Sequence, residues 1–226
     1  MRHHPDVRPS AVELTDVQFR YPSRPAPVLD GVSLRVPWGA VTRLHGANGV
    51  GKTTVLRLLV GLLAPQGGTL RVAGLDPVAE RLAVQRSIGY VSAGNGGLYA
   101  RLTVAQHLAI WARLRFVDRT RRPDVVARAL AAFGLEPLAR YRVDRLSMGQ
   151  RQRVRLALGL LDEPRVLLLD EPETSLDGNG REALAAAIDR IVASDGAVLW
   201  CSPADGDGGG PGSAALHLDA GRVTTA

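Results

Sequence analysis

The chain has a single cysteine and no long apolar run. Cys201 alone excludes an internal disulfide and a thiolate metal site, so we expect it to be a small buried hydrophobic residue. A membrane-spanning helix needs ~20 apolar residues, and the richest stretch, 55–64, is interrupted by Arg57. The first ten residues hold no apolar run typical of a signal peptide. These absences predict a protein that works in the cytoplasm and does not cross a membrane by itself.

Lysine is almost absent, although the chain is basic. Among the 28 basic residues Lys52 is the single lysine. The formal net charge of +6 and the pI near 10.3 suit a nucleic acid, an anionic membrane surface or a phosphate-rich ligand, so the charge alone does not choose. A length of 226 residues with 46% hydrophobic residues predicts one globular domain, or one domain with a small insertion.

The apolar pattern alternates between strand and helix spacing, which predicts an α/β fold. The bare apolar run 166–169 is typical of a central parallel strand, and a turn is expected at Gly67 and Gly68. Helical spacing dominates 103–133, where the residues expected to face inward are Val104, Leu108, Ile110, Trp111 and Leu114. Further strands are expected at 12–19, 32–36, 41–44, 70–72, 88–91 and 198–201, a strand pair within 216–223, helices at 53–63, 154–161 and 182–192, and a flexible loop at 205–213.

Residues 46–53, Gly-Ala-Asn-Gly-Val-Gly-Lys-Thr, match the phosphate-loop pattern between a predicted strand and a predicted helix. The glycines allow backbone amides to point at phosphate oxygens, and the following helix presents its positive end. Lys52, expected on an exposed loop, would reach the terminal phosphates, and Thr53 would offer its hydroxyl to magnesium. The alternative is an ordinary glycine turn before a helix, which the flanking strand and helix make the weaker interpretation.

The apolar strand at 166–169 ends in two acids. Asp170 would lie near the magnesium, and Glu171 would remain free to polarise water. Strands often end in acids, so this pair alone is a weak signal. It becomes a strong one ~120 residues after a phosphate loop in the same α/β domain.

A third motif carries a resemblance to a known family. Residues 146–150, Leu-Ser-Met-Gly-Gln, lie just before a helix rich in arginine. This motif closely resembles the signature of ATP-binding cassette (ABC) ATPases, with Met148 where a glycine is usual. Asp170-Glu171-Pro172 and the Ser-Leu-Asp at 175–177 resemble the Walker B motif and D-loop of that family. The resemblance covers nearly the whole chain, from about residue 12 to residue 223.

The resemblance implies ATP and Mg²⁺ as cofactors, Glu171 as the catalytic residue, Thr53 and Asp170 as metal ligands, and Tyr21 as the aromatic residue that stacks on adenine. The signature would hold the γ-phosphate of a nucleotide bound to another subunit, so a homodimer or heterodimer is implied. A plain helix cap explains the signature only locally. The implied nucleotide contacts are Tyr21, Gly46, Asn48, Gly49, Gly51, Lys52, Thr53, Thr54, Ser147, Gly149 and Gln150.

The resemblance also implies a fold and partners. It implies a single ABC ATPase domain over 1–226, with a RecA-like P-loop NTPase core at 11–91 and 151–226. This core would carry an antiparallel β subdomain, and a helical subdomain would span about 92–150. The expected partners are a transmembrane permease and a second ABC ATPase subunit, with no nucleic acid, at the cytoplasmic face of the cell membrane. Residues 97–103 resemble the ABC-2 type exporter branch and the compact length resembles the haem-exporter ATPase, which favours export.

Two other functions stay open. The basic charge permits a soluble ABC protein that acts on nucleic acid or ribosomes. Such relatives usually carry tandem cassettes or a long coiled-coil insert, and ~50 residues between Ser92 and Leu146 are too few for that arm. A regulatory, non-hydrolysing cassette is the other alternative, and the intact pair of Asp170 and Glu171 argues against it.

The chain departs from the family pattern in two places. After the strand 88–91 the family usually has a glutamine that touches magnesium and senses the membrane partner. Here 92–97 offers only Asn95 as an amide, so a surrogate contact and a bland loop both stay open. Pro203 stands where the family has a histidine that contacts the γ-phosphate, and no other histidine, His45 included, is positioned in sequence to replace it. We therefore expect ATP binding with impaired hydrolysis at this chain's own site.

Overall fold

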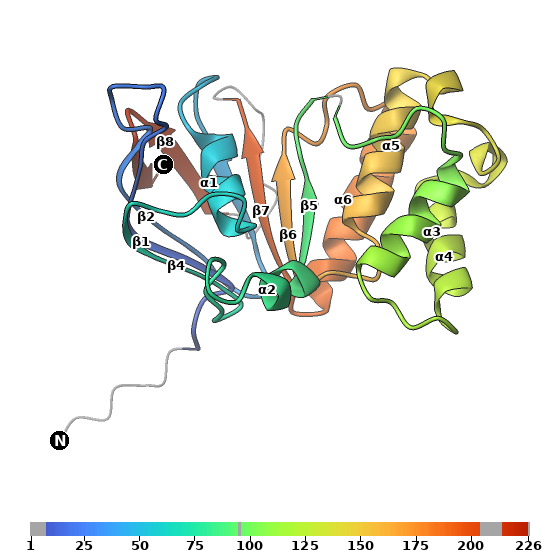
Figure 1. The fold of residues 1–226 in the computed structure, drawn as a ribbon, viewed down its shortest axis with the longest axis horizontal. Helices are drawn as coiled ribbons and strands as arrows, with labels where there is room; N and C mark the ends of the chain where they lie inside the picture. Colours follow the sequence, from blue (N-terminus) through green and yellow to red (C-terminus); the bar gives the residue numbers. More distant parts are fainter. Residues whose placement is uncertain (1–7, 95, 204–213, 226) are drawn as a thin grey trace.

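The computed structural model of the chain describes residues 8–94, 96–203 and 214–225. Asn95 and the glycine-rich loop expected at 205–213 lie outside the described residues. Within them the fold is a mixed α/β arrangement of one mostly parallel sheet, one antiparallel sheet and two groups of helices (Figure 1).

The larger sheet has six strands in the order β5-β6-β7-β3-β8-β9, in which only the β8–β9 pair is antiparallel. All residues of β6 and β7 are buried, so the apolar run at 166–169 is a central strand covered on both faces, as predicted. The strands are Val41–His45 (β3), Ile88–Val91 (β5), Val166–Asp170 (β6), Ala197–Ser202 (β7), Ala214–Asp219 (β8) and Arg222–Thr225 (β9).

Neighbouring residues of the central strands belong to two different hydrophobic clusters. Leu168 and Leu199 pack in the cluster that includes helix α1 (Lys52–Leu59). Leu167 and Trp200 pack in the cluster that includes helices α5 (Met148–Gly159) and α6 (Gly178–Ala193). Because successive side chains of a strand point to opposite faces, these two strands join both clusters into one core.

The smaller sheet is antiparallel, in the order β2-β1-β4, and consists of Val12–Phe19 (β1), Leu29–Val36 (β2) and Gly67–Val72 (β4). The turn predicted at Gly67 and Gly68 is wrong, because both glycines begin β4. A Cβ atom at Gly68 would lie 2.4 Å from the carbonyl oxygens of Thr15 and Asp16, where β1 has an irregular register. The glycine therefore allows two strands to approach closely rather than reversing the chain.

The helices α3 (Val104–Leu114) and α4 (Arg122–Ala132) lie at one end of the molecule beside α5, with 3₁₀ turns at Glu136–Leu138 (η1) and Val143–Arg145 (η2) (Figure 1). The predicted inward face of α3 is correct for Val104 and Leu108, which are buried. It is wrong for Ile110, which is 37% exposed, and for Leu114, which is 63% exposed. Each stands two residues beyond the buried positions 108 and 112, about 200° around the helix.

Several helix ends differ from the prediction. The helix expected at 53–63 ends at Leu59, and Gly61 follows with a φ of 70° that interrupts the helical path. The helices expected at 154–161 and 182–192 begin earlier, because Ser147 and Asp177 accept hydrogen bonds from their first turns. Helix α2 (Arg81–Ser87) has no counterpart in the prediction.

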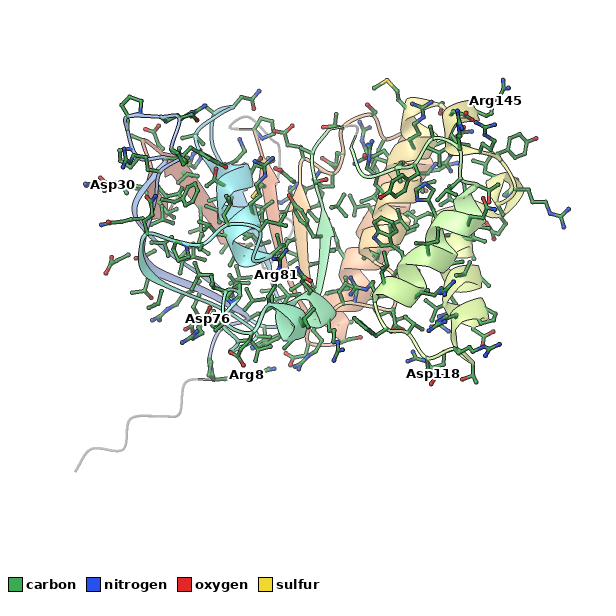
Figure 2. All side chains as sticks on the ribbon, viewed as in Figure 1. Arg8, Asp30, Asp76, Arg81, Asp118 and Arg145 are labelled. Carbon is green, nitrogen blue, oxygen red and sulfur yellow. The ribbon has the colours of Figure 1, made fainter. Side chains whose placement is uncertain are left out.

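Most charged side chains of the described chain lie outside its core. Figure 2 places Asp30, Asp76, Asp118 and Arg145 at its periphery. The ion pair between Arg71 and Asp76, 2.7 Å long, joins partly exposed groups and contributes little to stability. None of the helices in the described ranges has both the length and the apolar character that crossing a bilayer requires.

Replacing Gly89 of β5 by alanine should destabilise the fold, because its Cβ atom would lie 2.2 Å from the carbonyl oxygen of Gly159 in α5. Forcing this contact apart should lower the free energy of unfolding by about 1–3 kcal/mol, measured by urea denaturation. Gly178→Ala is the control, since a Cβ atom there meets nothing within 4 Å. Equal denaturation midpoints for Gly89→Ala and wild type would contradict the close packing of β5 on α5.

Candidate functional site

The glycine-rich residues 46–51 connect β3 to α1. A Cβ atom at Gly46 would lie 2.5 Å from the carbonyl oxygen of Leu218, so only glycine fits beside β8. Gly49 and Gly51 have φ values of 81° and 123°, which other residue types adopt only with strain. Asn48 lies in the exposed turn of this loop. Helix α1 has no side-chain cap and no acid in its first turn, so its first amides are available to an anion.

Lys52 lies inside this loop. Its side-chain ammonium donates hydrogen bonds to the carbonyl oxygens of Gly46, at 2.6 Å, and Ala47, at 3.1 Å. The residue is 5% exposed, so the expectation of an exposed lysine is wrong. The reason is that Lys52 is the first residue of α1 and its ammonium reaches back to the carbonyl oxygens of the loop. A buried positive charge beside free helix amides suits a polyanion.

The structure brings together Thr53 at the start of α1 and Asp170 at the end of β6. The Thr53 hydroxyl donates a 2.7 Å hydrogen bond to Oδ2 of Asp170. Asp170 is 1% exposed, and within the described ranges no cationic side chain lies at ion-pair distance from it. A buried carboxylate without a compensating charge is unfavourable, and hydroxyl and carboxylate oxygens are the ligands that Mg²⁺ prefers. The pair therefore fits a magnesium ion.

The buried carboxylate affects two neighbouring acids. Burial, followed by the charge of Asp170, raises the pKa of the Cys201 thiol well above its ordinary value. Burial and Asp170 also raise the pKa of Tyr90 to about 12. Both groups are therefore neutral at physiological pH, and Cys201 is the small buried residue that the sequence predicts.

Tyr21 follows β1 and lies next to the start of helix α1. Its hydroxyl is 3.2 Å from the hydroxyl of Thr54, and its ring packs edge-on against Phe19 at 4.9 Å. The ring remains half-exposed. The contact with Thr54, in helix α1, thus places the half-exposed Tyr21 beside the phosphate loop.

Glu171 occupies a strained turn directly after β6. Its φ is 47°, a left-handed conformation that costs a non-glycine residue roughly 1–3 kcal/mol and persists only where neighbours hold it. The Glu171 amide donates to the carbonyl oxygen of Cys201 at 3.0 Å. The side chain is half-exposed. The turn therefore lifts this carboxylate out of the sheet, beside the buried Asp170.

The signature residues form the start of α5. Ser147 and Gln150 make a complete capping box. The backbone amide of Gln150 donates to the Ser147 hydroxyl at 3.2 Å, and the backbone amide of Ser147 donates to Oε1 of Gln150 at 2.9 Å. A Cβ atom at Gly149 would lie 2.8 Å from the carbonyl oxygen of Ser175. In Figure 1, α1 and α5 lie on either side of strands β7, β6 and β5, so the structure does not bring this motif to the phosphate loop.

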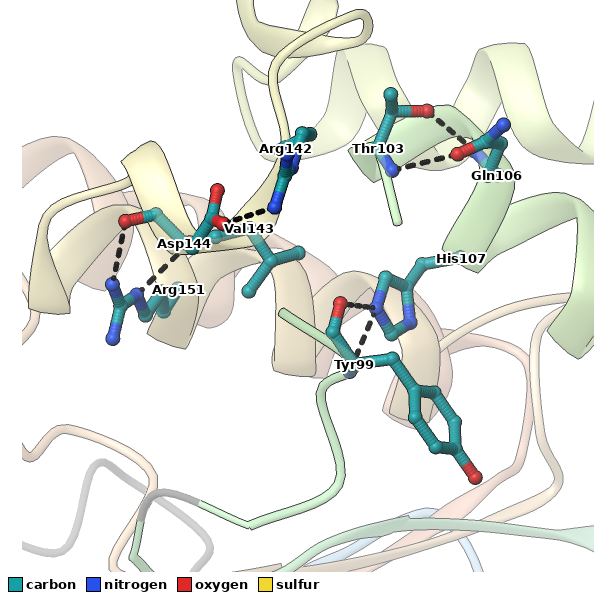
Figure 3. A network of polar contacts seen from close by, with 8 residues as sticks. All are labelled: Tyr99, Thr103, Gln106, His107, Arg142, Val143, Asp144 and Arg151. Carbon is teal, nitrogen blue, oxygen red and sulfur yellow. Dashed lines mark hydrogen bonds and ion pairs between the residues drawn. The ribbon is translucent and has the colours of Figure 1, made fainter. Parts of the chain in front are cut away.

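A network of polar contacts holds the signature helix against the preceding turns (Figure 3). Arg151 of α5 donates to the carbonyl oxygens of Val143 and Asp144, at 3.1 and 3.2 Å. The side chain of the buried His107 contacts the backbone of Tyr99 at 3.0 Å. The Arg151 contacts join η2 to α5, and the His107 contact joins the backbone before α3 to that helix.

Sequence position did not anticipate the surroundings of Pro203. The parallel register pairs His45 with Ser202, and the Ser202 hydroxyl lies 2.9 Å from Nδ1 of His45. The same nitrogen is 3.5 Å from the carbonyl oxygen of Pro203, and the ring centroids of His45 and His217 are 5.6 Å apart. Two histidines therefore lie at the strand end that the proline follows. The sequence predicts both strands, but it does not say that they pair or in which register. The position of His45 beside Ser202 therefore could not be predicted from it.

The comparisons with known proteins agree with these motifs. The family model "ABC transporter" matches residues 29–174. YbhF of Escherichia coli, a probable multidrug ABC transporter ATP-binding protein, is 35% identical over 84% of this chain and 33% of its own length. NatA of Bacillus subtilis, an ABC transporter ATP-binding protein, is 32% identical over 84% of this chain and 78% of its own length. The chain thus spans about a third of YbhF but most of NatA.

Solved structures support the fold. The ATP-binding cassette MJ0796, in a dimeric post-hydrolysis state with ADP and phosphate, has a TM-score of 0.80 at 23% identity and covers 94% of this chain and 96% of that one. CbiO1 of Clostridium perfringens, part of the CbiONQ transporter complex, has a TM-score of 0.77 at 25% identity over 96% of this chain and 88% of that one. With its phosphate loop, buried acid and signature helix, the chain belongs to the ABC transporter family as an ATP-binding cassette of the ATPase type.

Proposed function

We propose that this chain is the nucleotide-binding subunit of an ABC transporter, which uses ATP and Mg²⁺ to drive a separate permease. The observation that carries the proposal is the contact between Thr53 and Asp170, which lie 117 residues apart in sequence. It joins the phosphate loop and the acidic strand end into one site with the chemistry for a magnesium nucleotide. A single ABC ATPase domain over 1–226, with its helical part at about 92–150, belongs to this proposal.

Each site residue then has a role. The first amides of α1 and the ammonium of Lys52 bind phosphate oxygens, together with the turn at Gly46, Asn48, Gly49 and Gly51. Thr53 and Asp170 would hold Mg²⁺, which neutralises phosphate charge when bound.

The remaining groups act around the phosphates. Glu171 accepts a proton from the attacking water, because its carboxylate lies outside the buried strand. When Tyr21 stacks on adenine, its contact with the Thr54 hydroxyl breaks. The Thr54 hydroxyl then donates a hydrogen bond to a phosphate oxygen.

The signature completes the site of a second subunit. Its residues Ser147, Gly149 and Gln150 lie at the start of α5, and a helix N-terminus stabilises an anion. Because α5 lies apart from α1 within the chain, the phosphate that it binds belongs to a nucleotide on another cassette. The partner is a second copy of this chain or a different ABC ATPase subunit.

An apolar groove is proposed as the docking site of the permease. It has a volume of about 330 Å³ and is lined by Leu62, Leu98, Trp111 and Leu158 among others. Leu62 is 54% exposed, as an unpartnered docking surface requires. A cytoplasmic segment of the permease would fill it. The proposal therefore includes a position at the cytoplasmic face of the membrane, and it includes no nucleic acid partner.

Export is the proposed direction of transport. It is supported by the similarity to YbhF and to DrrA3 of Streptomyces coeruleorubidus, a daunorubicin resistance protein that is 36% identical over 84% of this chain and 59% of its own length. NikO of Rhodobacter capsulatus, a nickel import protein, is 40% identical over 79% of this chain. Transport assays with the permease in inverted vesicles test the direction: uptake of substrate on addition of ATP means export.

Lys52→Ala should lower ATP affinity at least 100-fold, because the variant loses the only ammonium in the loop. Isothermal titration calorimetry measures the affinity, and a thermal melt checks the fold. Arg24→Ala, which removes one exposed positive charge before β2, is the matched control. Unchanged ATP affinity in Lys52→Ala would refute the phosphate-binding role of the loop.

Glu171→Gln should bind ATP as wild type does but accumulate as an ATP-bound dimer. The neutral amide has a similar shape and cannot accept the proton of the attacking water. Size-exclusion chromatography with Mg²⁺ and ATP measures the dimer. A variant that stays monomeric, alone and mixed with its partner cassette, would overturn the shared-site proposal.

Pro203→His should raise steady-state turnover at least tenfold, equivalent to about 1.4 kcal/mol of barrier. The imidazole would contact the γ-phosphate and orient the water, whereas proline has no side-chain donor. Pro203→Ala is the control that relaxes the backbone without adding a ring nitrogen. A wild-type chain that turns over at ~1 per second or faster without a partner would refute impaired hydrolysis.

A further inference from the structure

A side chain of α5 makes a hydrogen bond to the backbone of the strained turn at Glu171. Pro172, the next residue, has no amide hydrogen, and its carbonyl oxygen accepts a 2.8 Å hydrogen bond from Nε2 of Gln152. Gln152 is 5% exposed, so water does not compete for this contact. The Gln152 side chain therefore contacts the backbone one residue beyond the proposed catalytic carboxylate.

The same glutamine is bound on its other side by an arginine. Nη1 of Arg155 donates to Oε1 of Gln152 at 3.0 Å, and Nε of Arg155 donates to the carbonyl oxygen of Gly96 at 3.2 Å. Because proline can only accept and arginine can only donate, the orientation of the Gln152 amide is determined. The contacts form a continuous path between Gly96 and Pro172, in which Arg155 donates to both Gly96 and Gln152, and Gln152 donates to Pro172.

Arg155 is an unusual residue for this interior position. It is 9% exposed, and in the described part of the chain no carboxylate lies at ion-pair distance. Burial, and then the charge of Arg151, lower the pKa of Arg155. A buried guanidinium with only neutral acceptors contributes little to the stability of the fold, so its contacts point to a role other than stability.

Arg155 and Gly96 also line the groove of about 330 Å³ described above. We propose that Gln152 and Arg155 form a relay that couples the groove to the turn of Glu171, and that both are positioning residues for hydrolysis. This proposal rests on the proposed function, since it assigns the groove to a partner and the carboxylate to catalysis. It gives Gly96, which follows β5 where the family usually has a glutamine, a route to the active site through the side chains of Arg155 and Gln152.

The relay acts through the conformation of the turn. A partner segment that shifts the backbone at Gly96 changes the hydrogen bond that Arg155 makes there. Arg155 then moves the amide of Gln152, which adjusts the carbonyl of Pro172 and the strained φ of Glu171. Coupling between two sites is reciprocal, so nucleotide at the phosphate loop must also alter the segment at 92–98.

Hydrogen–deuterium exchange of the full chain tests this reciprocity without hydrolysis. We expect a non-hydrolysable ATP analogue with Mg²⁺ to change exchange in peptides 46–54 and 92–98 of the wild type. Gln152→Glu keeps the acceptor for Arg155 and removes the donor to Pro172, so peptide 92–98 should lose at least half of its response while 46–54 keeps its own. Gln18→Glu, the same charge change on an exposed residue of β1, is the matched control.

A kinetic measurement separates positioning from stability. The single-turnover rate of bound ATP should fall at least fivefold in Gln152→Glu, with the ATP dissociation constant within twofold of wild type and an unchanged melting temperature. Arg155→Lys should recover part of the rate lost in Arg155→Ala, because an ammonium can still donate to Oε1 of Gln152.

Three results would overturn the relay: an equal 92–98 response in wild type and Gln152→Glu, no 92–98 response in a wild type whose 46–54 peptide is protected, or an unchanged hydrolysis rate. A wild type whose 46–54 peptide shows no protection would instead overturn the proposed nucleotide-binding function, and the relay with it.

Discussion

The buried carboxylate of Asp170 is the constraint on which the site depends. Strand β6 is apolar on both faces and carries this acid into the interior, where it is 1% exposed. A carboxylate in such surroundings needs partners, and the Thr53 hydroxyl is the one that the described chain supplies. In the proposed function, a cation bound by Asp170 and Thr53 would balance this buried charge and the charge of a phosphate group beside Lys52.

Close backbone approaches transmit this arrangement to the helical end of the molecule. Gly89 of β5 and Gly159 of α5 allow the sheet and the helix to touch, since a Cβ atom at either would lie within 2.4 Å of the other element. Gly149 likewise allows the start of α5 to approach the backbone of Ser175 closely. Helix α5 therefore carries the signature at one end and packs closely on β5 at the other.

Structure and sequence disagree where a residue's surroundings come from distant elements. Lys52 is an exception, because it is buried by its own loop, whose carbonyl oxygens at Gly46 and Ala47 accept from its ammonium. Ile110 and Leu114 are exposed because α3 packs through positions 104, 108 and 112, a stripe that apolar spacing alone did not separate from its neighbours. His45 lies beside Ser202 only because β3 and β7 pair in parallel.

The sequence by itself determined the class of fold, the central strand at 166–169 and the family, because these follow from local spacing and from motifs whose chemistry depends on neighbouring residues. The pairing of Thr53 with Asp170 could be expected from those motifs, since each has a known phosphate or metal role. The relay through Gln152 and Arg155 could not, because the sequence does not say which carbonyl a buried side chain will meet. Only the tertiary structure decides such contacts, since they join backbone atoms that lie far apart along the chain.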